Sequence, residues 1–267
     1  MHILFIGYGK TSQRLAKQLS VQGHQISTIS LTPKTDPYGK HHVQDVHQLN
    51  LTDFTPIDCV YVLLSPRESI VGAYQHTYLD TTTPIVAALQ SHPIQRLIVV
   101  SSTRVYGENQ GQEVNDETDV QPSDVQGQIL YDMEQAYLKA YPQQTVIVRP
   151  SGIYGTSVAR MQKMAKTMQH YPNVHWSNRI HINDVVRFLA HLLHVEHVEK
   201  SYILSNNQPQ LLHEVVQWFQ RQMYLPLLTL DSEKVTGKKL YATRLAQTGF
   251  QLQHQDCFAD YAALMKI

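Results

Sequence analysis

The sequence predicts an α/β fold, a doubly wound parallel sheet with a small C-terminal lobe. Apolar runs typical of buried strands recur along the chain and alternate with stretches of helical apolar spacing, as in repeated strand, helix, strand units. The first run is followed at once by a glycine turn and a helical stripe. The length of 267 residues suits one such domain with an appended lobe better than two full domains.

Strand and helix positions follow from the same periodicities. A polar, His-rich connector with a short, poorly defined strand is expected over 35–50. Pro84 is expected to kink or break the helix in which it lies. The expected strands lie near 2–6, 25–30, 58–64, 95–100, 145–149 and 201–205, and the helices that follow the first one lie near 70–89, 126–139, 185–193 and 211–223.

The turn after the first strand has the spacing of a dinucleotide-binding turn. Gly7 would permit the tight bend, and Gly9 would let the backbone approach a pyrophosphate at the helix N-terminus. Ser12 replaces the third glycine of the usual fingerprint, and its hydroxyl can cap a helix turn or donate to a phosphate. With Lys10 and Thr11, these residues form the predicted Rossmann-type cofactor turn. An ordinary strand, turn and helix is the alternative.

Residues after the second strand bear on the choice of cofactor. NAD sites usually place a carboxylate here to hold the ribose hydroxyls, whereas this chain has Ser30, Thr32 and Lys34. Because none of these would repel a 2′-phosphate, the sequence slightly favours NADP over NAD. A solvated loop is the alternative. Leu64 and Ser65, at the end of the third strand, are further candidates for cofactor contact.

Composition excludes several classes of partner. The chain has 22 Lys and Arg residues and 22 Asp and Glu residues, so its formal net charge is zero. Such a charge does not favour a nucleic acid or an anionic membrane as partner. No apolar stretch approaches the roughly 18 residues of a membrane span. Cys59 and Cys257 predict free thiols in a reducing cytoplasm rather than a disulfide. The 15 His lack the short spacing of ligand sets, so no metal site is predicted.

The fourth strand is followed by Ser101-Ser102-Thr103-Arg104-Val105-Tyr106-Gly107. This segment resembles the strand-end segment of extended short-chain dehydrogenase/reductases, the NAD-dependent epimerase/dehydratase group. In that group a Ser or Thr three residues before Val-Tyr-Gly polarises the substrate, and Ser102 occupies this place. The resemblance further implies that Thr103 and Arg104 contact the substrate.

Two later segments extend the resemblance. Residues 146–155 are similar to the family's Arg-Pro…Tyr-Gly segment, and 179–185 to its Ile-His-Val-x-Asp motif. They imply substrate contacts at Tyr154 and at Arg179, which would hold an anionic substrate. In sugar-nucleotide enzymes the corresponding arginine usually lies farther from the His.

Plainer interpretations of the same segments are structural. Arg149-Pro150 ends a strand, and Tyr154-Gly155 can form the turn into the lobe. Asn183 or Asp184 would cap the next helix, and His181 would be a buried, hydrogen-bonded side chain. With the last strand and the helix after it, the resemblance covers nearly the whole chain. It implies a dinucleotide-binding domain over 1–155 that 178–205 completes, and a substrate lobe formed by 156–177 and 206–267.

Chemistry in this family depends on a Tyr-x-x-x-Lys pair, in which the ammonium lowers the pKa of the phenol. The family's glutamate four residues after the lysine matches Glu134, so Gln126 stands at the tyrosine position and Leu130 at the lysine position. None of the 15 Tyr is followed by Lys four residues later. Tyr131 lies about 100° round the helix from Leu130 and should not face the same pocket.

Two hypotheses remain open. The chain is either an enzyme of altered mechanism, using Ser102 and a replacement acid such as Tyr106 or a substrate group, or a non-catalytic nucleotide-binding sensor. The expected partners are a dinucleotide and an unidentified small-molecule substrate. A homodimer through the helices near 70–89 and 126–139 is an expectation of the resemblance.

Overall fold

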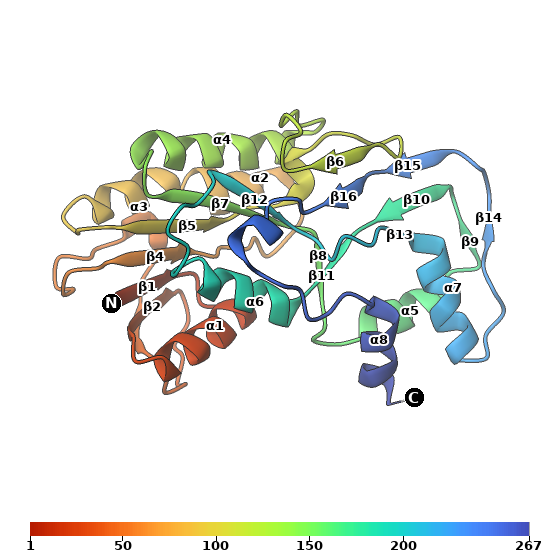
Figure 1. The fold of residues 1–267 in the computed structure, drawn as a ribbon, viewed down its shortest axis with the longest axis horizontal. Helices are drawn as coiled ribbons and strands as arrows, with labels where there is room; N and C mark the ends of the chain where they lie inside the picture. Colours follow the sequence, from red (N-terminus) through yellow and green to blue (C-terminus); the bar gives the residue numbers. More distant parts are fainter. Residues whose placement is uncertain (267) are drawn as a thin grey trace. The chain divides into compact units, whose positions relative to one another are not determined.

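The computed structural model, described here for residues 1–266, contains a seven-stranded parallel sheet with helices on both faces (Figure 1). The strand order is β12-β7-β5-β4-β1-β2-β3, so the chain reverses its direction of travel across the sheet between β1 and β4. This confirms the predicted fold class. The strands are β1 His2–Ile6, β2 Gln25–Ser30, β3 Lys40–Val43, β4 Cys59–Val62, β5 Arg96–Val100, β7 Thr145–Pro150 and β12 Ser201–Leu204.

Helices α1 and α6 cover one face of this sheet, and α2, α3 and α4 cover the other (Figure 1). The central strands are enclosed between these helices, and every residue of β1 and β4 is buried. The Tyr61 hydroxyl of β4 donates to the carbonyl of Leu189 in α6 at 2.8 Å. The bounds are α1 Lys10–Val21, α2 Val71–Tyr74, α3 Thr82–Leu89, α4 Val125–Ala140 and α6 Ile182–His191.

The helix predicted over 70–89 is interrupted, but not at Pro84. A π-helical turn, Gln75–Leu79, follows α2, and a two-residue turn, Asp80 and Thr81, separates it from α3, which begins at Thr82. Pro84 therefore lies in the first turn of α3, where its missing N–H breaks no hydrogen bond.

The predicted cap of α6 is wrong. The helix begins at Ile182, so Asn183 and Asp184 lie inside its first turn. Nδ1 of His181 accepts from the backbone N–H of Asn183 at 3.2 Å and takes the capping role. The Asp184 carboxylate instead accepts from the backbone N–H of His254 at 2.9 Å.

The chain divides into two compact units. The first contains Met1–Gly107, Val120–Arg149 and Val185–Tyr202, and the second contains Glu108–Asp119, Pro150–Asp184 and the described residues from Ile203 on. Residues 108–119 group with the second unit because β6 pairs with β16 there. Within residues 1–266, no helix combines the length and apolar character that a membrane crossing requires.

The described residues of the second unit form short strand pairs, one three-stranded sheet and three helices around their own apolar core. This core contains Tyr154, Val215, Phe219 and Tyr261. The elements are β6 Glu113–Asn115, β8 Gly152–Tyr154, α5 Ala159–Thr167, β9 His170–Tyr171, β10 Val174–Ser177, β11 Arg179–His181, β13 Gln210–Leu211, α7 Leu212–Gln222, β14 Thr229–Leu230, β15 Val235–Gly237, β16 Lys239–Tyr241 and α8 Cys257–Met265.

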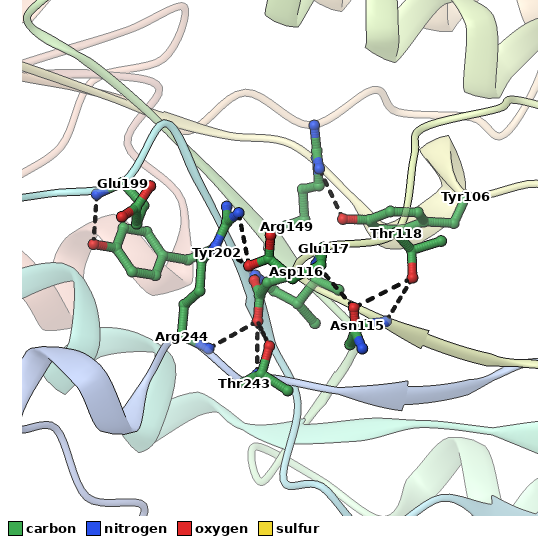
Figure 2. Close-up of polar contacts among 11 residues, drawn as sticks. Tyr106, Asn115, Asp116, Glu117, Thr118, Arg149, Glu199, Tyr202, Thr243 and Arg244 are labelled. Carbon is green, nitrogen blue, oxygen red and sulfur yellow. Dashed lines mark hydrogen bonds and ion pairs between the residues drawn. The ribbon is translucent and has the colours of Figure 1, made fainter.

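A buried carboxylate joins separate segments of this unit. Asp116 accepts from the backbone N–H groups of Ile203 at 2.6 Å, Thr243 at 2.7 Å and Arg244 at 3.0 Å, and Figure 2 shows it with Thr243 and Arg244. The Thr243 hydroxyl also donates to it at 3.1 Å, so four charge-assisted bonds satisfy the carboxylate and this residue has a structural role.

Candidate functional site

The turn after β1 contains two glycines, and one of them leaves the backbone accessible to a ligand. Gly7 has φ +91°, and a Cβ there would lie 2.3 Å from the carbonyl oxygen of Leu63, directly after β4. Gly9 is the N-cap residue of α1, and nothing lies within 4 Å of a Cβ built on it. Gly7 therefore permits close packing, whereas Gly9 leaves free space beside a helix N-terminus.

The turn stands at the topological switch point of the sheet. β1 pairs with β2 on one side and β4 on the other, and ligands of open α/β sheets bind outside the carboxyl ends of such strands. Leu64 is brought to the turn, since its Cδ2 lies 3.2 Å from a Cβ built on Gly7. Ser65 follows as an exposed residue.

Ser12 supports the turn from inside. It is buried, and its hydroxyl donates to the carbonyl of Gly7 at 2.7 Å. Its single proton is thus directed at the backbone rather than toward a ligand. Lys10 and Thr11 begin α1, the first exposed and the second half-buried.

The loop after β2 uses one of its predicted ligands internally. The Ser30 hydroxyl donates to the carbonyl of Thr32 at 2.8 Å, and the Thr32 side chain is exposed. Lys34 is half-buried and makes no hydrogen bond or ion pair within residues 1–266. The Lys34 ammonium and the exposed Thr32 hydroxyl therefore remain available to a phosphate.

The same loop carries an acidic residue that sequence reasoning missed. The Tyr8 hydroxyl, between the two glycines, donates to Asp36 Oδ1 at 2.7 Å, and the other carboxylate oxygen is buried without a partner in the structure. Burial and the bond to Asp36 raise the pKa of Tyr8 well above its usual range. The sequence carries little indication of this contact, because Asp36 lies outside any periodic segment and is brought to the turn only by the folded loop.

Ser102 begins the short 3₁₀ turn Thr103–Val105 after β5. Its Oγ accepts from the backbone N–H of Arg104 at 3.2 Å and the residue is half-buried, so its hydroxyl proton is not used by that bond. The half-buried Thr103 follows in the same turn. Ser102 thus combines a capping role with the capacity to donate to a ligand.

The Arg104 guanidinium is held by the start of α4. Its Nε donates to Asp124 Oδ1 at 3.0 Å, and a terminal nitrogen donates to Gln126 Oε1 at 2.6 Å. It also lies 5.6 Å from the centre of the Tyr74 ring. Burial acts to lower the pKa of Arg104, but the bond and charge of Asp124 outweigh it and raise that pKa. Arg104 therefore places a positive charge against the side chain of Gln126.

Further along α4, the side chains turn into the protein. Leu130 is 1% exposed, and Glu134 is fully buried and pairs with Arg149, whose terminal nitrogen lies 2.6 Å from Glu134 Oε2. The other terminal nitrogen donates to the Tyr106 hydroxyl at 2.8 Å, as Figure 2 shows. Burial acts to lower the pKa of Arg149, but the hydrogen bond and the charge of Glu134 outweigh it and raise that pKa. Tyr106 is enclosed at 1% exposure, which is unfavourable for a replacement acid.

Tyr154 and Arg179 lie on paired strands of the second unit. The Tyr154 hydroxyl donates to Asp260, and burial together with this bond raises its pKa. Arg179 is 6% exposed and donates to the Tyr261 hydroxyl at 3.1 Å and to Ser177 Oγ at 3.0 Å. No carboxylate of residues 1–266 bonds the Arg179 guanidinium, so this buried cation has only neutral partners.

A group of potential metal ligands nearby has the wrong geometry for an ion. His181, His254 and Asp260 offer ligand atoms within 4.8 Å of one another. The two imidazole rings, however, are stacked with centroids 3.6 Å apart and planes 19° apart. A metal binds in the plane of each ring at about 2 Å, and no point satisfies two nearly parallel planes at this spacing. His254 Nδ1 instead bonds Asp260 at 2.7 Å.

Comparison with known proteins agrees with the observed fold. Residues 7–203 match the sequence model of the NAD dependent epimerase/dehydratase family. Protein YeeZ of Escherichia coli (strain K12) is 27% identical over 204 residues, covering 72% of this chain and 72% of that protein.

Two solved structures have the same fold. MoeE5 in complex with UDP-glucose and NAD is 17% identical with a TM-score of 0.83, covering 100% of this chain and 98% of that one. Human epimerase family protein SDR39U1 with NADPH is 18% identical with a TM-score of 0.78, covering 100% of this chain and 99% of that one. At these identities the likeness concerns the fold alone.

Proposed function

Because the chain belongs to the NAD dependent epimerase/dehydratase family, we propose that it binds NAD or NADP at the turn between β1 and α1. The observation that carries this proposal is Gly9, a helix N-cap residue with free space above it at the switch point of the sheet. The backbone N–H groups of Lys10 and Thr11 would face the pyrophosphate. MoeE5 and human SDR39U1, which share the fold, are described with NAD and with NADPH.

The residues present fit such a group. Gly7 lets the turn pack closely against Leu63. Ser12 holds the Gly7 carbonyl, and Leu64 lies beside Gly7. Ser65 is exposed just beyond. The preference for NADP predicted from the sequence depends on Lys34, which has no bond within residues 1–266 and could pair with a 2′-phosphate.

The chemistry of this protein differs from that of a Tyr-Lys enzyme. A bound nicotinamide would supply hydride transfer, but Gln126 has no proton to exchange and the buried Leu130 brings no charge. Ser102 remains able to donate a hydrogen bond to a substrate oxygen. We therefore expect altered or no oxidoreductase and epimerase activity, with an unidentified small molecule as substrate. Thr103, Tyr154 and Arg179 are the further candidate contacts to it.

A non-catalytic cofactor sensor is the second candidate. The bond between Arg104 and Gln126 supports it, because Gln126, at the tyrosine position, already has a protein partner. Tyr106, the replacement acid considered above, is likewise bonded to Arg149. Loss of an activity on substitution of Ser102 with Ala would favour the enzyme, and a cofactor-binding protein with no such activity would favour the sensor. The homodimer and the cytoplasmic location stay predictions.

Calorimetric titration of Gly9→Val with NAD(H) and NADP(H) tests the cofactor site. No atom lies within 4 Å of the added Cβ, so the variant should fold normally, while its side chain fills the space that the pyrophosphate needs. We expect affinity to fall at least about tenfold. Gly72→Val is the matched control, since a Cβ at Gly72 also meets nothing and the residue lies in α2. Equal affinities of both variants and the wild type would reject the site.

A further inference from the structure

One cation connects the start of α4 with the end of α2. A terminal nitrogen of the Arg104 guanidinium donates to Gln126 Oε1 at 2.6 Å, and the guanidinium carbon lies 5.6 Å from the centre of the Tyr74 ring. Tyr74 is the last residue of α2, and α2 packs against α4. Because Gln126 stands at the family's tyrosine position, a phenol from another helix lies beside the cation that bonds the side chain at this position.

The Arg104 guanidinium is fixed in place. Its Nε donates to both oxygens of Asp124, at 3.0 Å and 3.1 Å, and its Nη2 to Gln126, so these bonds leave Nη1 over. Burial acts to lower the pKa of Arg104, whereas Asp124 and, after it, the charge and a hydrogen bond of Tyr74 raise that pKa. An attraction between two charges is reciprocal, so a guanidinium that a phenolate stabilises also stabilises the phenolate.

Two other phenols of the first unit are less suited to exchange a proton. Tyr78, one turn after Tyr74, is in edge contact with it at 5.3 Å between ring centres. Burial, with the charge of Tyr74 added to it, raises the pKa of Tyr78 to about 12. Tyr106 is 1% exposed and accepts a hydrogen bond from Arg149. Of these three phenols, the half-buried Tyr74 is the one that combines access from solvent with the Arg104 cation.

We propose that Tyr74 is the catalytic acid that replaces the missing tyrosine, with Arg104 in the role of the missing lysine. This inference rests on the proposed cofactor function. Tyr74 gives its proton to the oxygen of a substrate carbonyl, an aldehyde or ketone that the dinucleotide reduces to an alcohol while being oxidised itself. The guanidinium stabilises the phenolate left behind, which then takes a proton from solvent. Ser102, two residues before Arg104, has a hydroxyl proton for the same carbonyl oxygen.

Labelling of the whole protein with an aryl sulfonyl fluoride, without cofactor, tests the pair. A phenolate oxygen attacks the sulfur, fluoride leaves, and mass spectrometry locates the sulfonate ester. The rate at Tyr74 is divided by that at Tyr224, which is 97% exposed and has no charged partner within residues 1–266. Arg104→Gln should lower this ratio about tenfold, and Arg104→Lys should keep most of it. Arg14→Gln is the matched control, because Arg14 lies in α1 on the opposite face of the sheet (Figure 1).

Tyr74→Phe is a second, independent variant, assayed with NADH or NADPH on aldehydes and ketones that the wild type reduces. It should lower kcat about 10²-fold or more and change KM little, because it removes the proton and keeps the ring. A labelling ratio that Arg104→Gln leaves unchanged, or a full kcat in Tyr74→Phe, would overturn the inference while leaving the cofactor site intact. Calorimetry in which the wild type binds neither dinucleotide would instead overturn the proposed function and the catalytic role that rests on it.

Discussion

Two regions of the first unit, the glycine turn and the start of α4, differ in what they leave unsatisfied. At the turn, Gly9 faces free space and one Asp36 oxygen lacks a partner. At α4, Gln126 is bonded to Arg104, which Asp124 also holds, and Leu130 is packed inside. Free space beside a helix N-terminus can admit a ligand, whereas side chains bonded by the protein serve the structure. We propose on this basis that the cofactor half of the site keeps its capacity to bind, and that the residues at the proton-transfer positions now serve the scaffold.

The largest expected effect tests the scaffold interpretation of α4. Glu134→Ala leaves the Arg149 guanidinium buried without its carboxylate, and breaking such a pair destabilises a protein by about 3–5 kcal/mol. Urea denaturation measures the loss. Glu134→Leu combined with Arg149→Met should recover most of it, because an apolar pair of similar volume often replaces a buried ion pair without penalty. If Glu134→Ala kept full stability, this end of α4 would not be a structural element.

An intermediate effect is expected from Gln126→Tyr. The new phenol would lie near the Arg104 guanidinium, which now bonds the Gln126 amide at 2.6 Å. An opposite charge at this distance lowers a pKa by about 1–3 units, so the added tyrosine should titrate below its usual value of about 10. Ultraviolet difference titration against the wild type isolates this phenol.

Arg104→Gln in the Gln126→Tyr background is the control. It removes the cation and should return the phenol to its usual pKa. The structure makes this test sharper than installing the whole Tyr-Lys pair, since a lysine at position 130 would be placed in the protein interior. An unshifted phenol in the single variant would show that Arg104 does not replace the missing lysine.

Strand positions and the glycine turn could be predicted because they depend on local periodicity. β1, β2 and β12 begin where the apolar runs begin, and Gly7 needs its positive φ for the tight bend itself. The helix interruption before α3 was misplaced because the break precedes Pro84 instead of occurring at it. The sequence shows a proline, but not which turn of the helix contains it.

Long-range bonds explain what sequence reasoning missed at the site. The contact between Tyr8 and Asp36 joins residues 28 positions apart through a loop without periodicity. Arg104 and Gln126 are 22 positions apart and meet because Gly127 lets α4 approach, where a Cβ would lie 3.0 Å from the Arg104 carbonyl oxygen. Motif spacing predicts the family positions, whereas the bonds that their side chains make depend on the tertiary fold.

The smallest expected effect concerns Ser12, whose hydroxyl could either support the turn or donate to a phosphate. Its hydroxyl donates to the Gly7 carbonyl from a site 1% exposed, so Ser12→Ala should lower the free energy of unfolding by about 1 kcal/mol and change cofactor affinity little. Ser20→Ala is the matched control, because Ser20 makes the same kind of bond to the Lys17 carbonyl in an exposed part of the chain. Urea denaturation and calorimetric titration are measured on both variants. A loss of affinity at unchanged stability would mean that Ser12 bonds the phosphate, and the hydroxyl would then belong to the ligand site instead of to the support beneath it.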